Sequence, residues 1–250
     1  MSATNEECLV EAISTDLTME NPAEAARLRP VDEYDRYVLD KRREFSRLAP
    51  LYELLADLAT LGIARRMWRM VADIAAGAST QHVLELCCGT GRVTAHLAGL
   101  FRRVTGVDLS PAMLARARSK VRRLRLANVE LREAEVSTVR FAPRSLDALV
   151  ISLGMHELPE GIRAVILERA AKWIRPGGRV VIFDYRWPVS RLVSRLFTLG
   201  RFYFERNHFV DYLDYHRTLD IRLAEHGFAP VEKKSLFLSC LEIGVWEKIG

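Results

Sequence analysis

The hydrophobic pattern changes character part-way along the 250-residue chain. From about residue 36 to 79, apolar residues recur at intervals of three and four, with breaks at Pro50 and Gly62, which predicts two or three helices. From Gln81 onward, short β-rich runs alternate with helical patterns. Such alternation is typical of a parallel sheet covered by helices on both faces, so we predict an α/β fold.

The order of these runs predicts the architecture in more detail. Five predicted strands have the sequences HVLELC, RVTGVDL, NVELREAEV, DALVISL and GRVVIFDY, and helices begin at Gly91, Pro111 and Gly161. After Trp187, an amphipathic stretch is followed by a helical pattern, DYHRTLDIRLAEHGF, and by two β-like runs, APVEKKSLFLS and LEIGVWEKI. We expect a Rossmann-like, doubly wound, mostly parallel seven-stranded sheet with N-terminal helices and a C-terminal antiparallel hairpin at its edge.

The same pattern predicts a single domain behind a polar lead-in. Residues 1–35 are polar and acidic, and we expect them to precede the folded part. The domain would then span 36–250, with a helical cap over 36–79 and a helical lid inserted over 188–225.

The amino-acid composition limits the binding partners and the cellular location that can be expected. Lys and Arg number 37 against 32 Asp and Glu, a mild excess of +5, and the densest basic run, RARSKVRRLRL, is typical of the solvated side of a helix rather than of a nucleic-acid site. Four cysteines form no disulfide framework, and no Lys or Arg precedes Arg27 to start a secretory signal, so we expect a cytoplasmic protein. No three ligands at metal-binding spacing occur around His156, and no metal site is predicted.

Candidate chemistry lies in the turn after the first predicted strand, CCGTGR. Gly89 and Gly91 lack a Cβ, so a ligand can approach the backbone, and unpaired N–H groups follow at the next helix. Asp108 ends the second predicted strand, where a carboxylate suits a ribose diol. Glu85 lies within the first strand, and Thr94 occupies the place of the third glycine of a dinucleotide fingerprint. A nucleotide-like ligand is indicated, and these residues alone still permit NAD.

A family resemblance is carried by several motifs together. VLELCCGTGRVT, VTGVDLSPAML, REAEVSTVRF, LDALVISLGMHELP and WIRPGGRVVIFDY, in this order and spacing, resemble a class I S-adenosylmethionine-dependent methyltransferase over roughly residues 40–250. Within that superfamily the chain most resembles the ubiquinone/menaquinone biosynthesis C-methyltransferase family. The segment EFSRLAPLYELLADLATLGIARRMWR and the end HGFAPVEKKSLFLSCLEIGVWEK are also similar to that family.

The resemblance implies S-adenosylmethionine as the methyl donor and S-adenosylhomocysteine as the product. Glu85 would lie near the donor's ammonium group, Asp108 would hold the ribose hydroxyls, and Tyr52 would close over the carboxylate. Other residues would contact the adenine or the sulfonium side. The implied cofactor-binding residues are Tyr52, Glu85, Gly89, Thr90, Gly91, Asp108, Leu109, Met113, Glu135, Val136, Ser152 and Leu153.

One departure concerns the acceptor. Quinone methyltransferases tend to continue the fourth-strand motif as Gly-Leu-Arg-Asn, whereas this chain has Gly154-Met155-His156-Glu157. The sequence therefore supports the methyl donor more strongly than a quinone acceptor, and a lipid-like or other apolar small molecule stays open. Should the acceptor need a base, His156 is the candidate by type and position, with Tyr185 as a further candidate.

Several of these residues have simpler alternative roles. Ser110, ahead of Pro111, is a natural helix cap and leaves Asp108 for the ligand. Glu135 is equally a solvated loop acid, and Cys87 and Cys88 are expected to be packing residues.

An apolar band with interspersed arginines, 189–206, predicts a lid over the acceptor pocket or a helix at a membrane surface. Aromatic and histidine side chains of this part of the chain are candidates to line such a pocket: Tyr185, Tyr203, His208, Tyr212 and His216. Two other functions remain as alternatives: an NAD(P)-dependent oxidoreductase, and a non-catalytic scaffold that keeps the cofactor pocket.

Overall fold

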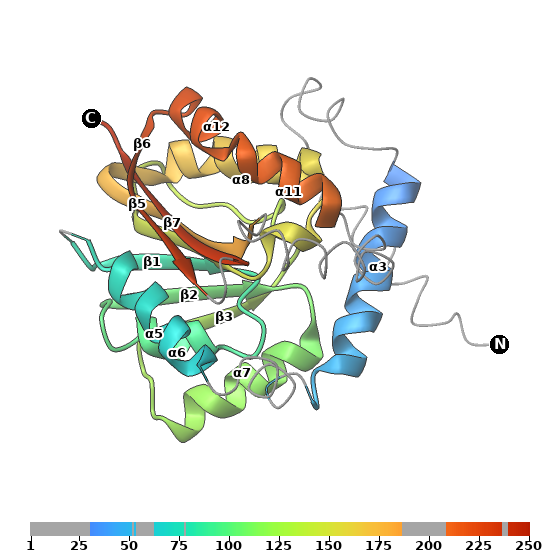
Figure 1. Ribbon diagram of the computed structural model, residues 1–250. Helices are drawn as coiled ribbons and strands as arrows, with labels where there is room; N and C mark the ends of the chain where they lie inside the picture. The colour runs from blue at the N-terminus through green and yellow to red at the C-terminus, as the bar shows by residue number, and fades with distance from the viewer. Residues whose placement is uncertain (1–30, 52, 54–62, 78, 187–208, 237–239) are drawn as a thin grey trace.

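A seven-stranded sheet forms the centre of the computed structural model, which describes residues 31–51, 53, 63–77, 79–186, 209–236 and 240–250 (Figure 1). The strands formed by these residues are β1 (His82–Leu86), β2 (Arg103–Asp108), β3 (Val129–Glu133), β4 (Leu146–Ser152), β5 (Ile174–Tyr185), β6 (Phe228–Leu236) and β7 (Leu241–Lys248). Their order is β3-β2-β1-β4-β5-β7-β6. Neighbours from β3 to β5 are parallel, while β7 runs antiparallel to β5 and β6. The predicted sheet and its edge hairpin are confirmed.

Helices cover both faces of the sheet. The described helices are α3 (Val31–Leu48), α5 (Ala64–Ala75), α6 (Arg92–Leu97), α7 (Pro111–Arg123), the short 3-10 helix η1 (Met155–Glu157), α8 (Glu160–Trp173), α11 (Phe209–Arg217) and α12 (Leu219–Glu225). In Figure 1, α5, α6 and α7 lie on one side of the strands and α8, α11 and α12 on the other, while α3 stands beside one end of the sheet.

The central strand β4 shows why the sheet is covered twice. Leu149 and Ile151 belong to the core packed against α8, α11 and α12, whereas Ala148 and Val150 belong to the core packed against α5 and α6. All four side chains are fully buried, so this part of the strand has no polar face and residues 148–151 form a continuous apolar run. Each fully buried branched side chain stabilises the fold by about 1.5–3 kcal/mol.

The strand order places a crevice between β1 and β4. The chain runs from β1 outward to β2 and β3, then returns to place β4 on the other side of β1. Helices therefore leave the carboxyl ends of these two strands in opposite directions and open a crevice between them, the usual ligand position in open α/β sheets. The turn after β1 and the end of β4 both border this crevice.

Two element boundaries differ from the prediction. The single helix expected over DYHRTLDIRLAEHGF is divided into α11 and α12 at Thr218, whose φ of −100° and ψ of 2° leave the helical region. The Thr218 hydroxyl donates to the Tyr215 carbonyl at 2.9 Å, a local bond that competes with helix continuation. At the other end of the chain, α3 already begins at Val31, inside the expected lead-in.

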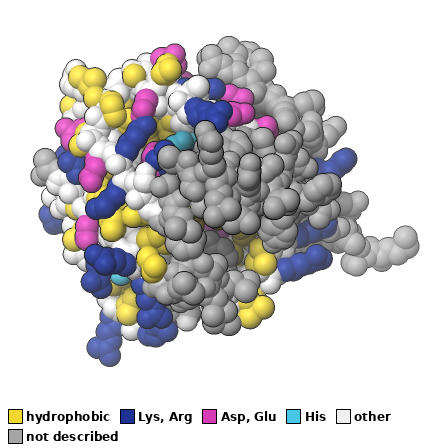
Figure 2. Space-filling model, viewed as in Figure 1, with side chains coloured by type: hydrophobic (Ala, Val, Ile, Leu, Met, Phe, Trp, Pro, Cys, Tyr) yellow, Lys and Arg dark blue, Asp and Glu magenta, His cyan; other side chains and the backbone are white. Residues whose placement is uncertain are grey.

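The surface agrees with the expected role of the basic run. Arg116, Arg122 and Arg123 are exposed on α7, which confirms that most of its cations lie on a solvated helix face. Basic and acidic side chains are interspersed over the described surface seen in Figure 2. Within the described part of the chain, no helix is both long and apolar enough to cross a bilayer.

Candidate functional site

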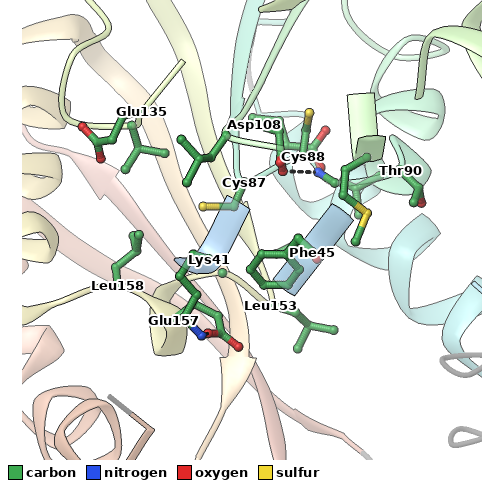
Figure 3. Close-up of a pocket in the computed structure, with 18 of the residues that line it drawn as sticks. Lys41, Phe45, Cys87, Cys88, Thr90, Asp108, Glu135, Leu153, Glu157 and Leu158 are labelled. Atoms are coloured by element: carbon green, nitrogen blue, oxygen red, sulfur yellow. Dashed lines mark hydrogen bonds and ion pairs between the residues drawn. The ribbon is translucent and has the colours of Figure 1, made fainter. Parts of the chain in front are cut away.

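The candidate site is a pocket at the carboxyl ends of β1, β2 and β4, closed on one side by α3 (Figure 3). Its lining among the described residues is Tyr37, Val38, Lys41, Phe45, Trp68, Glu85, Cys87, Cys88, Gly89, Thr90, Arg92, Val93, Asp108, Leu109, Met113, Glu135, Val136, Ser152, Leu153, Gly154, Glu157 and Leu158. Ten of the twelve residues predicted to bind a cofactor are in this lining. Gly91 is not, and Tyr52 lies outside the described residues.

Gly89 and Gly91, the two glycines of the turn, have different structural roles. Both have positive φ, 52° at Gly89 and 72° at Gly91, a region that favours glycine. A Cβ at Gly89 would have nothing within 4 Å, so this backbone is open to the pocket. A Cβ at Gly91 would lie 3.0 Å from the Ala117 Cβ, which shows that Gly91 allows close packing of α7.

Asp108 links the β1 turn to the end of β2. Its carboxylate accepts the Gly89 N–H at 2.7 Å, the dashed line in Figure 3, and the Ser110 N–H at 2.9 Å. Burial raises the pKa of Asp108, and these N–H bonds oppose the rise. The Ser110 hydroxyl meanwhile accepts the Met113 N–H at 3.3 Å, so Ser110 caps the helix as expected, and ligand binding by Asp108 stays a prediction.

Glu85 is a buried carboxyl group at the floor of the pocket. Only 1% of the residue is exposed, and its carboxyl accepts a hydrogen bond from the Thr94 hydroxyl. Burial raises the pKa of Glu85 to about 8, despite the opposing effect of that bond. A carboxyl group in this state is ready to ionise when a ligand brings a positive charge.

Glu135 and Val136 form another part of the wall, in the loop after β3. The Glu135 carboxylate accepts the Ser137 N–H at 2.7 Å and also the Ser137 hydroxyl. Glu135 is half-buried and lines the pocket, and it caps its own loop. Both roles considered for this acid are therefore compatible with its position.

The two neighbouring strands β1 and β4 end in left-handed residues that are not glycine. Cys87 has φ of 56° and Leu153 has φ of 51°, and both line the pocket. Gly154 makes room for Cys87, since a Cβ there would lie 2.6 Å from the Cys87 Cβ.

Cys87 and Cys88 are free thiols in the pocket wall. Burial raises the pKa of both well above the usual range, so neither is a thiolate at neutral pH. Both thiols pack as expected, but no sequence pattern indicated that they also form part of the pocket wall.

The two catalytic candidates lie behind the pocket rather than in its lining. His156 Nδ1 donates to an oxygen of Asp184 at 2.7 Å, and its Nε2 lies 3.3 Å from an oxygen of Glu157. Burial would lower the pKa of His156, but the two carboxylates raise it to about 9, so the ring is charged at neutral pH and a weak base. The Tyr185 ring packs edge-on against it at 4.9 Å. Their catalytic roles stay predictions.

The remaining predicted residues are also placed. Tyr212 is fully buried, its ring 6.3 Å from His156. The His216 Nε2 lies 3.3 Å from a Glu242 oxygen. The band 189–206, with Tyr203 and His208, lies outside the described residues.

The sequence did not indicate that helix α3, Trp68 and Arg92 contribute to the pocket lining. Tyr37, Lys41 and Phe45 of α3 line the pocket although they precede the glycine turn by more than forty positions. Arg92 also faces it, with its guanidinium 4.1 Å from the centre of the Trp68 ring and 3.3 Å from a Glu53 oxygen. The amphipathic pattern of the first helices predicted that one helix face is buried. It did not predict that this face lines the pocket.

Comparison with known proteins places this geometry in a family. Residues 83–178 match a model described as a methyltransferase domain. The chain is 34% identical over 163 residues to the ubiquinone/menaquinone biosynthesis C-methyltransferase of Syntrophotalea carbinolica, covering 63% of this chain and 66% of that protein. It is 32% identical over 166 residues to the demethylmenaquinone methyltransferase of Lactiplantibacillus plantarum, covering 64% of this chain and 68% of that protein.

This chain belongs to the class I S-adenosylmethionine-dependent methyltransferases. The alignment spans about two thirds of these relatives, slightly less for the first one. Among solved structures of the class I fold, phosphoethanolamine N-methyltransferase 2 of Haemonchus contortus, in complex with S-adenosyl-L-methionine, matches with a TM-score of 0.59 and 17% identity over 74% of this chain and 53% of that one. That likeness concerns the fold.

Proposed function

We propose that the chain transfers a methyl group from S-adenosylmethionine to an apolar small molecule of quinone type. The observation that carries the proposal is the buried Asp108 carboxylate, bonded to the open Gly89 turn at the crevice of the sheet. A carboxylate oxygen has more than one lone pair, so Asp108 can keep its N–H bonds and still accept from the two hydroxyls of a ribose.

The other residues of this half of the pocket suit the same ligand. Glu85 offers a buried carboxyl group to an ammonium, and Gly89 lets an amino-acid chain lie against the turn. Arg92, stacked on Trp68, would receive the carboxylate; it also contacts Glu53, the neighbour of Tyr52 in the sequence. Leu109, Met113 and Val136 would form the apolar walls for a flat base.

The chemistry asks little acid–base work of the chain. When bound, S-adenosylmethionine supplies a methyl group on a positively charged sulfur, which an electron-rich acceptor atom displaces in line. The residues of the pocket would align the two partners and exclude water. Leu153 and Gly154, at the end of β4, stand where the two halves of the pocket meet.

The quinone class of acceptor comes from the relatives, whose names describe a C-methyltransferase of ubiquinone/menaquinone biosynthesis and a demethylmenaquinone methyltransferase. The residues after β4, Met155 to Glu157, differ from those of quinone methyltransferases, so a lipid-like acceptor is the alternative. We further propose a cytoplasmic enzyme, whose apolar band 189–206 closes the pocket or contacts an anionic membrane surface.

Calorimetric titration with S-adenosylhomocysteine tests the donor assignment. We expect the wild type to bind, and Asp108→Ala to lose about 100-fold or more in affinity because two ribose hydroxyls lose a charged partner. Asp214→Ala, at an exposed aspartate on α11, is the control and should bind like the wild type. Circular dichroism checks that each variant is folded. Unchanged affinity in Asp108→Ala, or displacement of the ligand by NADH, contradicts the assignment.

A second experiment tests the transfer. Labelled S-adenosylmethionine is incubated with demethylmenaquinol and, separately, with lipid and quinone fractions of a cell extract, and products are identified by mass spectrometry. We expect label in an apolar product. Binding of S-adenosylhomocysteine without any labelled product would support the scaffold alternative instead.

A further inference from the structure

A buried ion pair faces the pocket on the side away from Asp108. Lys41 Nζ, on α3, lies 2.5 Å from a Glu157 oxygen on η1, and their side chains are 8% and 17% exposed. Both residues line the pocket, and Figure 3 shows Cys87 between this pair and Asp108. The pair is therefore separate from the half of the pocket assigned to the donor.

The same pocket is also lined by apolar Val38, Phe45, Leu153 and Leu158, while Lys41 Nζ lies 3.1 Å from an oxygen of Glu44, which is 43% exposed and lies outside the lining. Taking two charges out of water costs free energy that their mutual attraction offsets only in good geometry. A purely apolar contact between α3 and η1 would avoid this cost. The presence of the pair in this wall points to a polar group that it binds.

A chain of alternating charges holds Glu157 in place. His156 Nε2 lies 3.3 Å from its second oxygen, and His156 Nδ1 lies 2.7 Å from the fully buried Asp184 carboxylate. The Tyr37 hydroxyl donates to the Glu157 carbonyl. Burial would raise the pKa of Glu157, but His156 and Lys41 lower it to about 2, so it remains a carboxylate. The Glu157 carboxylate, a hydrogen-bond acceptor, and the Lys41 ammonium, a hydrogen-bond donor, thus lie side by side at fixed positions.

The pair selects among functional groups. A carboxylate could pair with Lys41 only while facing Glu157, an ammonium could pair with Glu157 only while facing Lys41, and a carbonyl or ether oxygen can accept but not donate. A hydroxyl satisfies both partners, because its O–H donates to Glu157 while its oxygen accepts from Lys41. Phe45 and Leu158 then provide apolar surface for the ring that carries the hydroxyl.

We propose that Lys41 and Glu157 bind the hydroxyl group of a phenol-type acceptor and thereby orient its ring toward the donor. This inference rests on the proposed function and adds the functional group that the acceptor must carry. The hydrogen bond from the O–H to Glu157 increases electron density on the ring carbons, and the weaker opposing effect of Lys41 comes with a fixed position of the oxygen. When a ring carbon attacks the methyl group, the new C–C bond forms as the methyl–sulfur bond breaks, and that carbon then releases its proton to water.

A competing explanation is that the pair merely fastens α3 to the sheet. The chain offers a matched control for this role. Arg42, also on α3, pairs with Glu133 of β3, and neither residue lines the pocket. Loss of that pair loosens the same helix and leaves the Lys41–Glu157 position intact.

The test compares two probes of nearly equal size, 1-naphthol and 1-methoxynaphthalene, titrated by ligand-observed NMR against the protein saturated with S-adenosylhomocysteine. We expect the wild type to bind 1-naphthol about tenfold or more tightly than its methyl ether, since the ether cannot donate to a carboxylate. Lys41→Met and Glu157→Gln should each reduce that preference to about twofold or less. Arg42→Met should retain it.

The outcomes separate this proposal from the proposed function. No preference in the wild type, no binding of either probe, or equal loss of preference in Arg42→Met would overturn the hydroxyl site. Failure of the wild type to bind S-adenosylhomocysteine would instead overturn the donor assignment. If Lys41→Met does not fold, Lys41→Arg and Glu157→Gln decide: the arginine variant should keep part of the preference and the glutamine variant should lose it.

Discussion

At the scale of single residues, the turn after β1 separates ligand contact from helix packing. Gly89 and Gly91 are two positions apart and share a left-handed backbone, yet only Gly89 faces open space. Their substitution by alanine adds the same methyl group with the same backbone strain. Differences in unfolding free energy and in ligand affinity between the two variants therefore report on the surroundings of each added Cβ.

We predict that Gly89→Ala costs about 1 kcal/mol of unfolding free energy, the usual cost of a left-handed residue with a Cβ, and weakens S-adenosylhomocysteine binding by about tenfold or more. Gly91→Ala should cost about 2 kcal/mol or more, because its Cβ also meets Ala117 at 3.0 Å. Urea unfolding and calorimetric titration measure both effects. Equal destabilisation, or full affinity in Gly89→Ala, would be inconsistent with this division.

Glu85 gives a prediction about proton linkage. Because its pKa is raised to about 8 without ligand, the group is protonated at pH 6 to 7 and must release a proton to meet an ammonium. We expect the affinity for S-adenosylhomocysteine to rise with pH between 6 and 7, by up to about tenfold per unit. Glu85→Gln, which keeps the shape of the side chain, should bind more weakly and lose the slope. An equal slope in both proteins would show that another group takes up the proton.

At the scale of elements, the ends of β1 and β4 are fitted to each other through one pair of residues. Cys87 projects a side chain from a left-handed position, and Gly154 on the neighbouring strand end has none. The Cys87 side chain, held at a strained backbone after β1, thus occupies the space that a side chain at Gly154 would fill. Such coupling is measured by a double-mutant cycle.

Gly154→Ala alone should cost about 2–3 kcal/mol, since its Cβ would lie 2.6 Å from the Cys87 Cβ. Cys87→Gly alone should be near neutral, because relief of the left-handed strain offsets the added flexibility of the unfolded chain. In the double variant, the cost of the alanine should fall below about 1 kcal/mol. Urea unfolding of the four proteins tests this, and additive costs would contradict the pairing.

The elements also show how far the sequence predicts this fold. The short β-rich runs located all seven described strands, and the central strands were the clearest because a strand buried on both faces is apolar along most of its length. The break at Thr218 was missed, since neither glycine nor proline marks it and a side-chain bond causes it. The left-handed Cys87 and Leu153 were missed for a similar reason, as glycine is the usual signal of such a backbone.

Within the candidate site, the sequence led to residues that line one pocket where they follow the ends of neighbouring strands, and their ligand contacts stay predictions. Gly89, Asp108 and Ser152 follow from the rule that parallel strands present their carboxyl ends to one crevice. Lys41 and Phe45 come from a helix whose docking depends on long-range packing, and no local pattern announces it. The raised pKa of His156 likewise depends on Asp184, twenty-eight positions away, and cannot be foreseen from its neighbours in the sequence.

At the scale of the whole molecule, buried titrating groups define a pH window of stability. The folded pKa of Glu85 is raised by burial to about 8, and that of His156 is raised to about 9 because Asp184 and Glu157 outweigh burial. Both groups therefore contribute stability at low pH that is lost as pH rises through these values. For Glu53 and Glu157, bonds to neighbouring cations outweigh burial and lower the pKa to about 2, so their contribution is lost as pH falls through 2.

We predict maximal stability near pH 4.5, the ordinary pKa of glutamate, with a fall of about 5 kcal/mol or more between pH 5.5 and 9. Urea unfolding of the ligand-free protein at several pH values checks this. Glu85→Gln should reduce the alkaline loss, because an amide carries no proton to lose. A stability that is level or rising toward pH 9 would refute the assignment.

The position of α3 allows the acceptor specificity of such an enzyme to change while its cosubstrate stays the same. The residues proposed for the donor come from β1, β2, β4, the turns that follow the strands and the helices α6 and α7, whereas Tyr37, Lys41 and Phe45 come from α3. Mutations in that helix can alter what is accepted while the core that grips the adenosyl moiety is left untouched. A graft of the first fifty residues from a relative would thus be a route to a new product with the old cosubstrate.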